Sequence, residues 1–159
     1  MQHLMMTTEE WFKEWEGNRR LTRKVIETFP EKELFEFSIG GMRTFAEMVY
    51  ELIQFSVEVT EQLIDNKPFP LDREHRKDYG VTKIALLASW DKSVLLAAEN
   101  WKKIPQERFQ EMFNMYEKLN APAWKNLLYV LENEIHHRAQ GYVYLRALGI
   151  EPLVFYDRS

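Results

Sequence analysis

Cysteine is absent from this 159-residue sequence, and its absence excludes three kinds of chemistry. The chain can form no disulfide, no cysteine-ligated zinc site and no thiol nucleophile of its own. A sequence without cysteine also fits the reducing environment of the cytosol. We therefore expect any catalytic or metal-binding group to come from histidine, carboxylate or amide side chains.

Basic blocks and long apolar runs are also missing. The formal net charge is −4 and the sequence pI is about 5.6, so phosphate contacts to a nucleic acid are not expected. No apolar run reaches the ~20 residues of a membrane-spanning helix, and the start "MQHLMMTTEEW" lacks the pattern of a signal peptide. These absences predict a soluble, cytoplasmic protein that binds neither nucleic acid nor membrane.

Apolar and aromatic residues are plentiful. They make up 45% and 14% of the sequence, which is enough for one hydrophobic core and too much for a disordered chain. The length predicts a single domain over residues 1–159. Only six glycines and six prolines occur, and most of them separate segments in which apolar residues recur at helical spacing. Four such segments lie at about 8–29, 44–65, 82–104 and 120–149.

Several short signals mark the ends of these segments. Thr7 with Glu10 fits a capping box at the start of the first helix. The same pattern recurs at Thr44 for the second helix, and Asn120 is the expected N-cap of the fourth helix. Gly149 is well placed to end that helix.

Four long amphipathic segments without convincing strands predict an all-α fold, specifically a four-helix bundle. A long polar loop, "DNKPFPLDREHRKDYG", follows the second helix, and a short extra helical segment at about 106–112 precedes the fourth. The spacing predicts that Ile84, Leu95 and Ile135 face inward.

Two adjacent histidines, His136 and His137, lie in the fourth helix. Bundle cores build metal sites from side chains spaced i,i+4, and this helix offers two such pairs, Glu132 with His136 and Asn133 with His137. Helical periodicity points 133 and 137 into a cleft with Val130, whereas His136 lies about 100° away, at the flank. From spacing alone, His137 is a metal ligand or an ordinary hydrogen-bonded core histidine, and both readings stay open.

The sequence resembles the DinB/YfiT-like family of metal-binding four-helix bundles. The strongest part of the resemblance is "EIHHRAQGYVYLRALGIEP" with the closing "FYD", and the second is "GGMRTFAEMVYEL" at the start of the second helix. The family's metal site is usually three histidines. By motif these fall on Glu51, Asn133 and His137, so only His137 is retained.

The resemblance implies two alternatives for function. In the first, Glu51, Asn133 and His137 hold a divalent transition metal (zinc, nickel or manganese), weakly because two imidazoles are replaced. The chain is then a metal-dependent thiol transferase or hydrolase acting on a small molecule such as a low-molecular-weight thiol, with Glu134 and His136 as candidate catalytic bases. In the second, the bundle has lost the metal and binds a small molecule or a protein partner in a stress response. Either way, the resemblance leads us to expect a homodimer.

Overall fold

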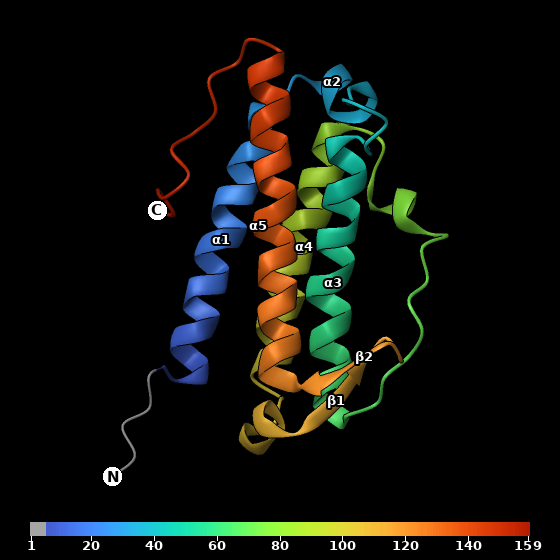
Figure 1. The fold of residues 1–159 in the computed structure, drawn as a ribbon, viewed down its shortest axis with the longest axis vertical. Coiled ribbons are helices and arrows are strands. Elements are labelled where there is room, and N and C mark those ends of the chain that lie inside the picture. Colours follow the sequence, from blue (N-terminus) through green and yellow to red (C-terminus); the bar gives the residue numbers. More distant parts are fainter. Residues whose placement is uncertain (1–5) are drawn as a thin grey trace.

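The computed structural model describes residues 6–159 and is mainly helical (Figure 1). In the described part, the elements in chain order are α1 (Thr8–Thr28), α2 (Glu31–Glu36), α3 (Phe45–Asp65), the 3-10 helix η1 (Arg76–Tyr79), α4 (Lys83–Trp101), the 3-10 helix η2 (Gln106–Gln110), β1 (Met112–Met115), β2 (Leu119–Pro122) and α5 (Ala123–Ala147).

Four long helices lie side by side and enclose the core. Helix α3 packs against α4 and α5, and α1 packs against the same two helices from the other side (Figure 1). One half of the core centres on Phe29, Phe45 and Trp90, and the other half on Trp15, Phe113 and Leu127. None of the helices in residues 6–159 is long and apolar enough to cross a lipid bilayer.

Three of the predicted helix-end signals, at Thr7, Thr44 and Gly149, are confirmed. Thr7 and Thr44 each accept a hydrogen bond from the backbone N–H three residues on, and the glutamate at that position bonds back to the cap. At the other end, Gly149 follows α5 with a φ of +76°, a left-handed conformation that glycine adopts without strain.

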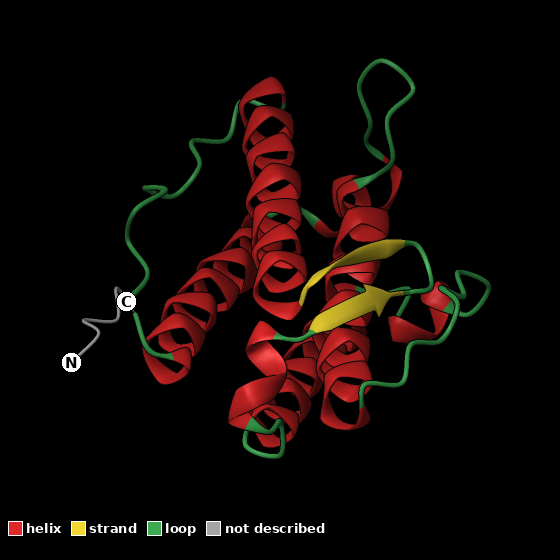
Figure 2. Ribbon diagram, turned by 60° about the horizontal axis from the view of Figure 1, so that its bottom comes forward, coloured by secondary structure: helices red, strands yellow, loops and turns green. Residues whose placement is uncertain are grey.

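The prediction of an all-α fold without strands is wrong in one place. Strands β1 and β2 form an antiparallel hairpin, with Met112 opposite Pro122 (Figure 2). Asn120 therefore lies in β2, and Pro122 rather than Asn120 is the N-cap of α5. The turn is left-handed at Tyr116 and Glu117, with φ of 54° and 59°. Neither residue signals such a turn in a sequence, because glycine and asparagine usually provide it.

The inward orientation predicted for three apolar residues is also wrong. Ile84 is 82% exposed, Leu95 is 66% exposed and Ile135 is 41% exposed. Helix α4 carries apolar residues on most of its faces, so periodicity alone does not identify the buried one. Its buried residues are Leu86, Trp90, Ser93, Ala97 and Asn100.

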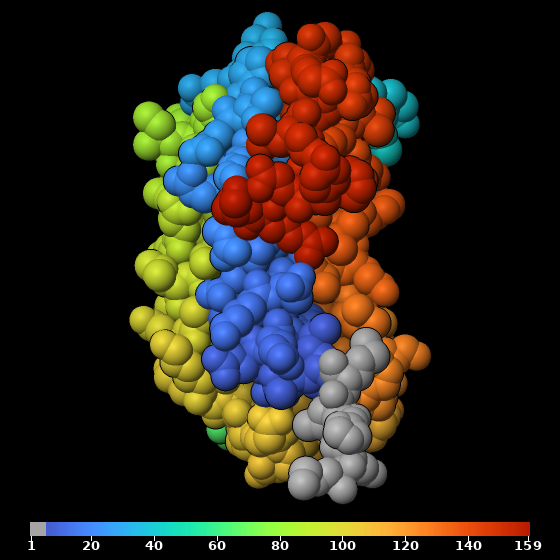
Figure 3. All heavy atoms as spheres, turned by 90° about the vertical axis from the view of Figure 1, so that its left-hand side faces the viewer, coloured from blue at the N-terminus to red at the C-terminus, as the bar shows by residue number. Residues whose placement is uncertain are grey.

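The chain after Gly149 is extended and lies across α1 (Figure 3). Arg158 pairs with Glu14 at 2.9 Å, and its backbone oxygen accepts a hydrogen bond from Arg20. The Nζ of Lys24 bonds the backbone oxygen of Ser159 at 2.7 Å. These polar contacts hold a segment that has no helical pattern of its own against the helices.

A buried group of charged side chains joins α1 to α5. Glu134 is 1% exposed, and its Oε1 accepts a hydrogen bond of 2.7 Å from Thr22. Arg19 lies 3.5 Å from the other carboxylate oxygen, and Arg138 lies 3.9 Å from the first. Arg138 also donates to the side chain of Asn18 at 2.9 Å. Because both arginines are buried, Glu134 is the counter-charge that makes their burial tolerable.

We expect the substitution Glu134→Gln to lower the free energy of unfolding by about 3 kcal/mol, because it leaves buried guanidinium groups without a carboxylate. Urea denaturation would measure the change. Glu132→Gln is the matched control on the same helix, since Glu132 is exposed and its loss should cost less than about 0.5 kcal/mol. Equal effects of the two substitutions would show that the buried charges are not coupled.

Helix α5 carries a glycine, Gly141, where it packs against Phe45 of α3. A Cβ atom built on Gly141 would lie 2.5 Å from the ring of Phe45. This ring is buried and stacks on Phe29 with a centroid separation of 4.7 Å, so it has no room to move away. Gly141 thus allows the two helices to come together one turn beyond His137.

We expect Gly141→Ala to destabilise the protein by about 1–2 kcal/mol. Overpacking costs about 1–3 kcal/mol, and a contact of 2.5 Å with a buried ring places the cost in the upper part of that range. The better helix propensity of alanine offsets about 1 kcal/mol of this cost. Gly17→Ala in α1 is the control, since its Cβ would meet Arg158 at an ordinary 3.4 Å. It should be neutral or stabilising. Thermal unfolding of both variants would measure this, and a Gly141→Ala variant as stable as the parent would contradict the packing described.

Candidate functional site

Glu51 lies at the centre of a cluster of polar side chains between α3 and α5. Its side chain is 10% exposed, and both carboxylate oxygens have two polar neighbours. Oε1 accepts a hydrogen bond of 3.2 Å from Asn133 and lies 3.1 Å from Nε2 of His137. Oε2 accepts hydrogen bonds from Arg43 at 2.7 Å and from Arg76 at 3.1 Å. We refer to these five residues as the Glu51 cluster.

Three separate parts of the chain supply the cluster. Asn133 and His137 are one helical turn apart on α5 and face α3, as the periodicity predicts. Arg43 stands just before the N-cap of α3 and reaches along that helix to Glu51, eight residues on. Arg76 comes from η1, within the long loop between α3 and α4. The cluster therefore fixes this loop to the helices.

Arg76 makes a second contact in the same region. Its Nε donates a hydrogen bond of 2.8 Å to Gln54, one turn beyond Glu51 on α3. Gln54 in turn donates to Glu58 at 3.1 Å. Burial raises the pKa of Glu58, although the hydrogen bond from Gln54 and the positive charge of Arg76 act to lower it. The loop is thus held against a row of polar residues on α3, namely Glu51, Gln54 and Glu58.

The neighbours of Glu51 determine its charge. Burial by itself would raise the pKa of this carboxyl group, but hydrogen bonds from His137 and Arg43 and the charge of Arg43 outweigh that effect. The result is a pKa well below the usual glutamate range. Glu51 is therefore a carboxylate at neutral pH, and the two guanidinium groups are its counter-charges.

His137 uses both ring nitrogens in this arrangement. Nδ1 lies 2.8 Å from Oε1 of Gln140, while Nε2 lies 3.1 Å from both the Glu51 carboxylate and Nη2 of Arg43. A ring that carries its proton on Nδ1 donates to Gln140 and accepts from Arg43. A proton on Nε2 instead points toward Glu51. In both cases Nε2 is already engaged with protein groups.

The residues present do not fit a transition-metal centre. Glu51 and His137 are suitable donors, but Asn133 has a neutral amide whose nitrogen contacts Glu51. Two guanidinium groups contact the same carboxylate, and their positive charges oppose a cation beside it. Across residues 6–159, no group of three or more histidine, cysteine, aspartate or glutamate side chains could hold a metal ion.

The two residues proposed as catalytic bases lie elsewhere on α5. Glu134 belongs to the buried charged group that faces α1, where Thr22 and two arginines are its partners. His136 is exposed, and its ring packs beside that of His137 with centroids 5.3 Å apart. The structure therefore brings Glu51, Asn133 and His137 together and leaves Glu134 and His136 outside the cluster.

Arg43 and Arg76 are the residues that the sequence reasoning missed. The spacing of Arg43 and Glu51 is a weak signal, because eight residues correspond to about two helical turns. Arg76 had no usable signal, since it lies in a loop rich in charges of both signs whose path no periodicity describes.

Comparisons with known proteins agree with this architecture. The crystal structure of a DinB-like protein from Bacillus cereus ATCC 10987 superposes with a TM-score of 0.75, covering 96% of this chain and 100% of that one. The two sequences are 14% identical, so this likeness concerns the fold. No curated protein sequence matches the chain significantly. The DinB family model, however, matches residues 4–159, and the chain therefore belongs to the DinB family.

Proposed function

We propose that this chain is a metal-independent member of the DinB family, a four-helix bundle that binds a small molecule rather than catalysing a metal-dependent reaction. In this proposal the Glu51 cluster takes the place of the metal centre that the family resemblance implies. The cluster holds the helices and the long loop together, and chemistry at a bound ion is not part of its role.

The observation that carries the proposal is the complete use of the Glu51 carboxylate. A metal ligand needs a free lone pair directed at the ion. Here four groups of the protein already surround the two oxygens. An ion bound to Glu51 would have to displace at least one guanidinium group from a largely buried carboxylate. That exchange loses a charge-assisted hydrogen bond and leaves an arginine beside a cation.

The placement of the remaining polar residues of α5 supports the same conclusion. Glu134 is committed to buried arginines, and His136 is exposed on a different face. Neither Glu134 nor His136 is therefore placed to act as a general acid or base at the Glu51 cluster. The metal-dependent transferase or hydrolase suggested by the resemblance has no further support in this geometry.

The first prediction concerns metal binding. Zinc, nickel or manganese should leave the melting temperature of the parent protein unchanged, because only binding to the folded state stabilises it. The double substitution Glu51→His and Asn133→His supplies three imidazoles with His137. Adding Arg43→Ala removes a competing cation, so the triple variant should be stabilised by the same metals. Differential scanning fluorimetry would measure all three proteins.

The control for this experiment is His137→Ala in the triple variant, which removes the third imidazole and should abolish the metal response. A parent protein stabilised by the metals as strongly as the triple variant would contradict the proposal, because the native residues would then form a competent site.

The second prediction concerns acid. Glu51 has a pKa that is lower in the folded state than the value of about 4.3 in an unfolded chain. Its contribution to stability is therefore present above that value and is lost as pH falls toward the folded-state pKa. The stability difference between the parent and Glu51→Gln should be largest near pH 7. Below about pH 4 it should shrink by up to about 1.4 kcal/mol per pH unit.

Urea denaturation at a series of pH values would measure this difference, with Glu132→Gln as the control for loss of an exposed carboxylate. A difference that stays constant from neutral to acidic pH would show that Glu51 is not held in its charged form by its neighbours.

A further inference from the structure

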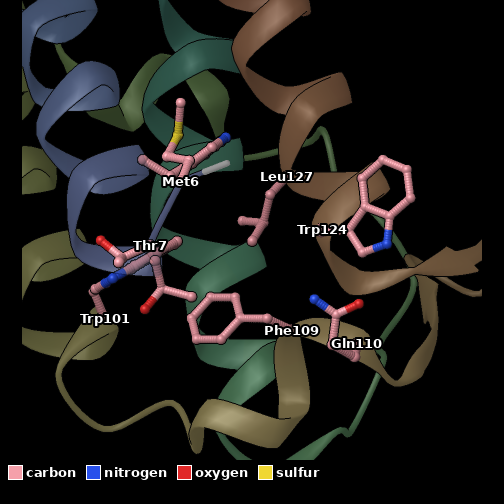
Figure 4. Close-up of a pocket in the computed structure, with 9 residues that line it drawn as sticks. Met6, Thr7, Trp101, Phe109, Gln110, Trp124 and Leu127 are labelled. Atoms are coloured by element: carbon pink, nitrogen blue, oxygen red, sulfur yellow. The ribbon is translucent and has the colours of Figure 1, made fainter. Parts of the chain in front are cut away.

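An aromatic pocket lies at the end of the bundle where α1 and α5 begin and α4 ends. It has a volume of about 120 Å³, is partly open to solvent, and is formed where the start of α1, the end of α4, η2 and the start of α5 meet. In Figure 4 the side chains of Phe109, Gln110, Trp124 and Leu127 surround one space, with Met6 and Thr7 on its opposite side. Trp11 and Trp101 also line this space.

The walls of this pocket are rigid and largely aromatic. Trp11 and Trp101 stack with ring centroids 5.3 Å apart and planes 8° from parallel. Trp101 also packs on Phe109 at 4.9 Å. Phe109 belongs to the half of the core that contains Trp15, and Trp11 and Trp101 pack against that half, so these rings are held in place. Trp124, by contrast, is 48% exposed.

The polar groups of the pocket are few and uncharged. Thr7 is used in the helix cap, and Thr8 donates to Gln106. Gln110 is exposed, and its side-chain amide projects beside Phe109 and Trp124 at the open side of the pocket (Figure 4). None of the lining residues within 6–159 carries a charge. The pocket therefore suits a neutral molecule with one hydrogen-bonding group.

The volume limits the size of that molecule. Cavities of about 150 Å³ lined by apolar side chains accept a single benzene ring, whereas pockets for drug-sized ligands are about 300 Å³ or more. From the size, the aromatic lining and the position of the Gln110 amide, we infer that this pocket binds an uncharged small molecule through one aromatic ring. The polar substituent of that ring hydrogen-bonds to Gln110.

This inference rests on the proposed role in binding a small molecule, and it names the place and the ligand class. The pocket is separate from the Glu51 cluster. Leu127 and His137 lie ten residues apart on α5, which corresponds to about 15 Å along the helix. A substitution at the pocket can therefore be tested without disturbing the Glu51 cluster.

The experiment uses phenol as the probe and the full chain as the protein. The indole N–H signals of the five tryptophans would be followed by NMR during a phenol titration. Signals from Trp11, Trp101 and Trp124 should shift in a saturable way, while that of the buried Trp90, which is not in the pocket, should stay in place. Benzoate should bind about tenfold more weakly than phenol, because none of the described lining residues is a cation that balances its charge.

Two substitutions in the pocket, with one control outside it, test the pocket itself. Trp124→Ala should weaken phenol binding about tenfold, and Tyr129→Ala, an exposed aromatic on the same helix outside the pocket, should change it less than twofold. Gln110→Ala should weaken phenol about fivefold and leave toluene unaffected, since toluene lacks the hydroxyl group. Far-ultraviolet circular dichroism would confirm that each variant is folded.

The absence of saturable shifts with phenol would overturn the inference, and so would equal losses in Trp124→Ala and Tyr129→Ala. These failures are distinct from failure of the proposed function. If the parent protein binds phenol and is also stabilised by metals, the inference about the pocket stands and the metal-independent role is wrong. If it neither binds phenol nor responds to metals, only the inference about the pocket is wrong.

Discussion

The hydrogen bonds and ion pairs of Glu51 connect three parts of the molecule at one carboxylate. One carboxylate holds Arg43 from the start of α3, Arg76 from the long loop, and two side chains of α5. The family resemblance implies neutral imidazoles around a divalent cation. Here a negative carboxylate is surrounded by two positive guanidinium groups, so the positive charge of the centre comes from the chain itself. A centre built in this way needs no metal to balance its charge.

Helix α5 contributes side chains to two polar groups on different faces, the Glu51 cluster and the buried charged group around Glu134. Asn133 and His137 face α3, with Gly141 allowing close contact one turn later. Glu134 and Arg138, each one residue further along, face α1. A step of one residue turns the helix by about 100°, which explains why neighbours in sequence serve different interfaces. It also explains why the adjacent histidines differ, with one inside the cluster and the other exposed.

The sequence predicted the features that depend on local chemistry. Capping by Thr7 and Thr44 needs only residues three positions apart, and the facing of His137 follows from helical spacing. The hairpin could not be predicted, because its left-handed turn uses Tyr116 and Glu117 and is supported by Gln62, far away in sequence. Arg76 was not predicted for the same reason. Tertiary packing brings it to Glu51 on α3, 25 residues away in sequence, and no local sequence pattern indicates such a contact.

The claim that the chain's own cations have replaced the metal can be tested on the protein as purified. Elemental analysis of protein produced without a histidine tag would measure zinc, nickel and manganese per chain. The account predicts no stoichiometric metal. One ion per chain, lost when His137 is replaced by alanine, would contradict it.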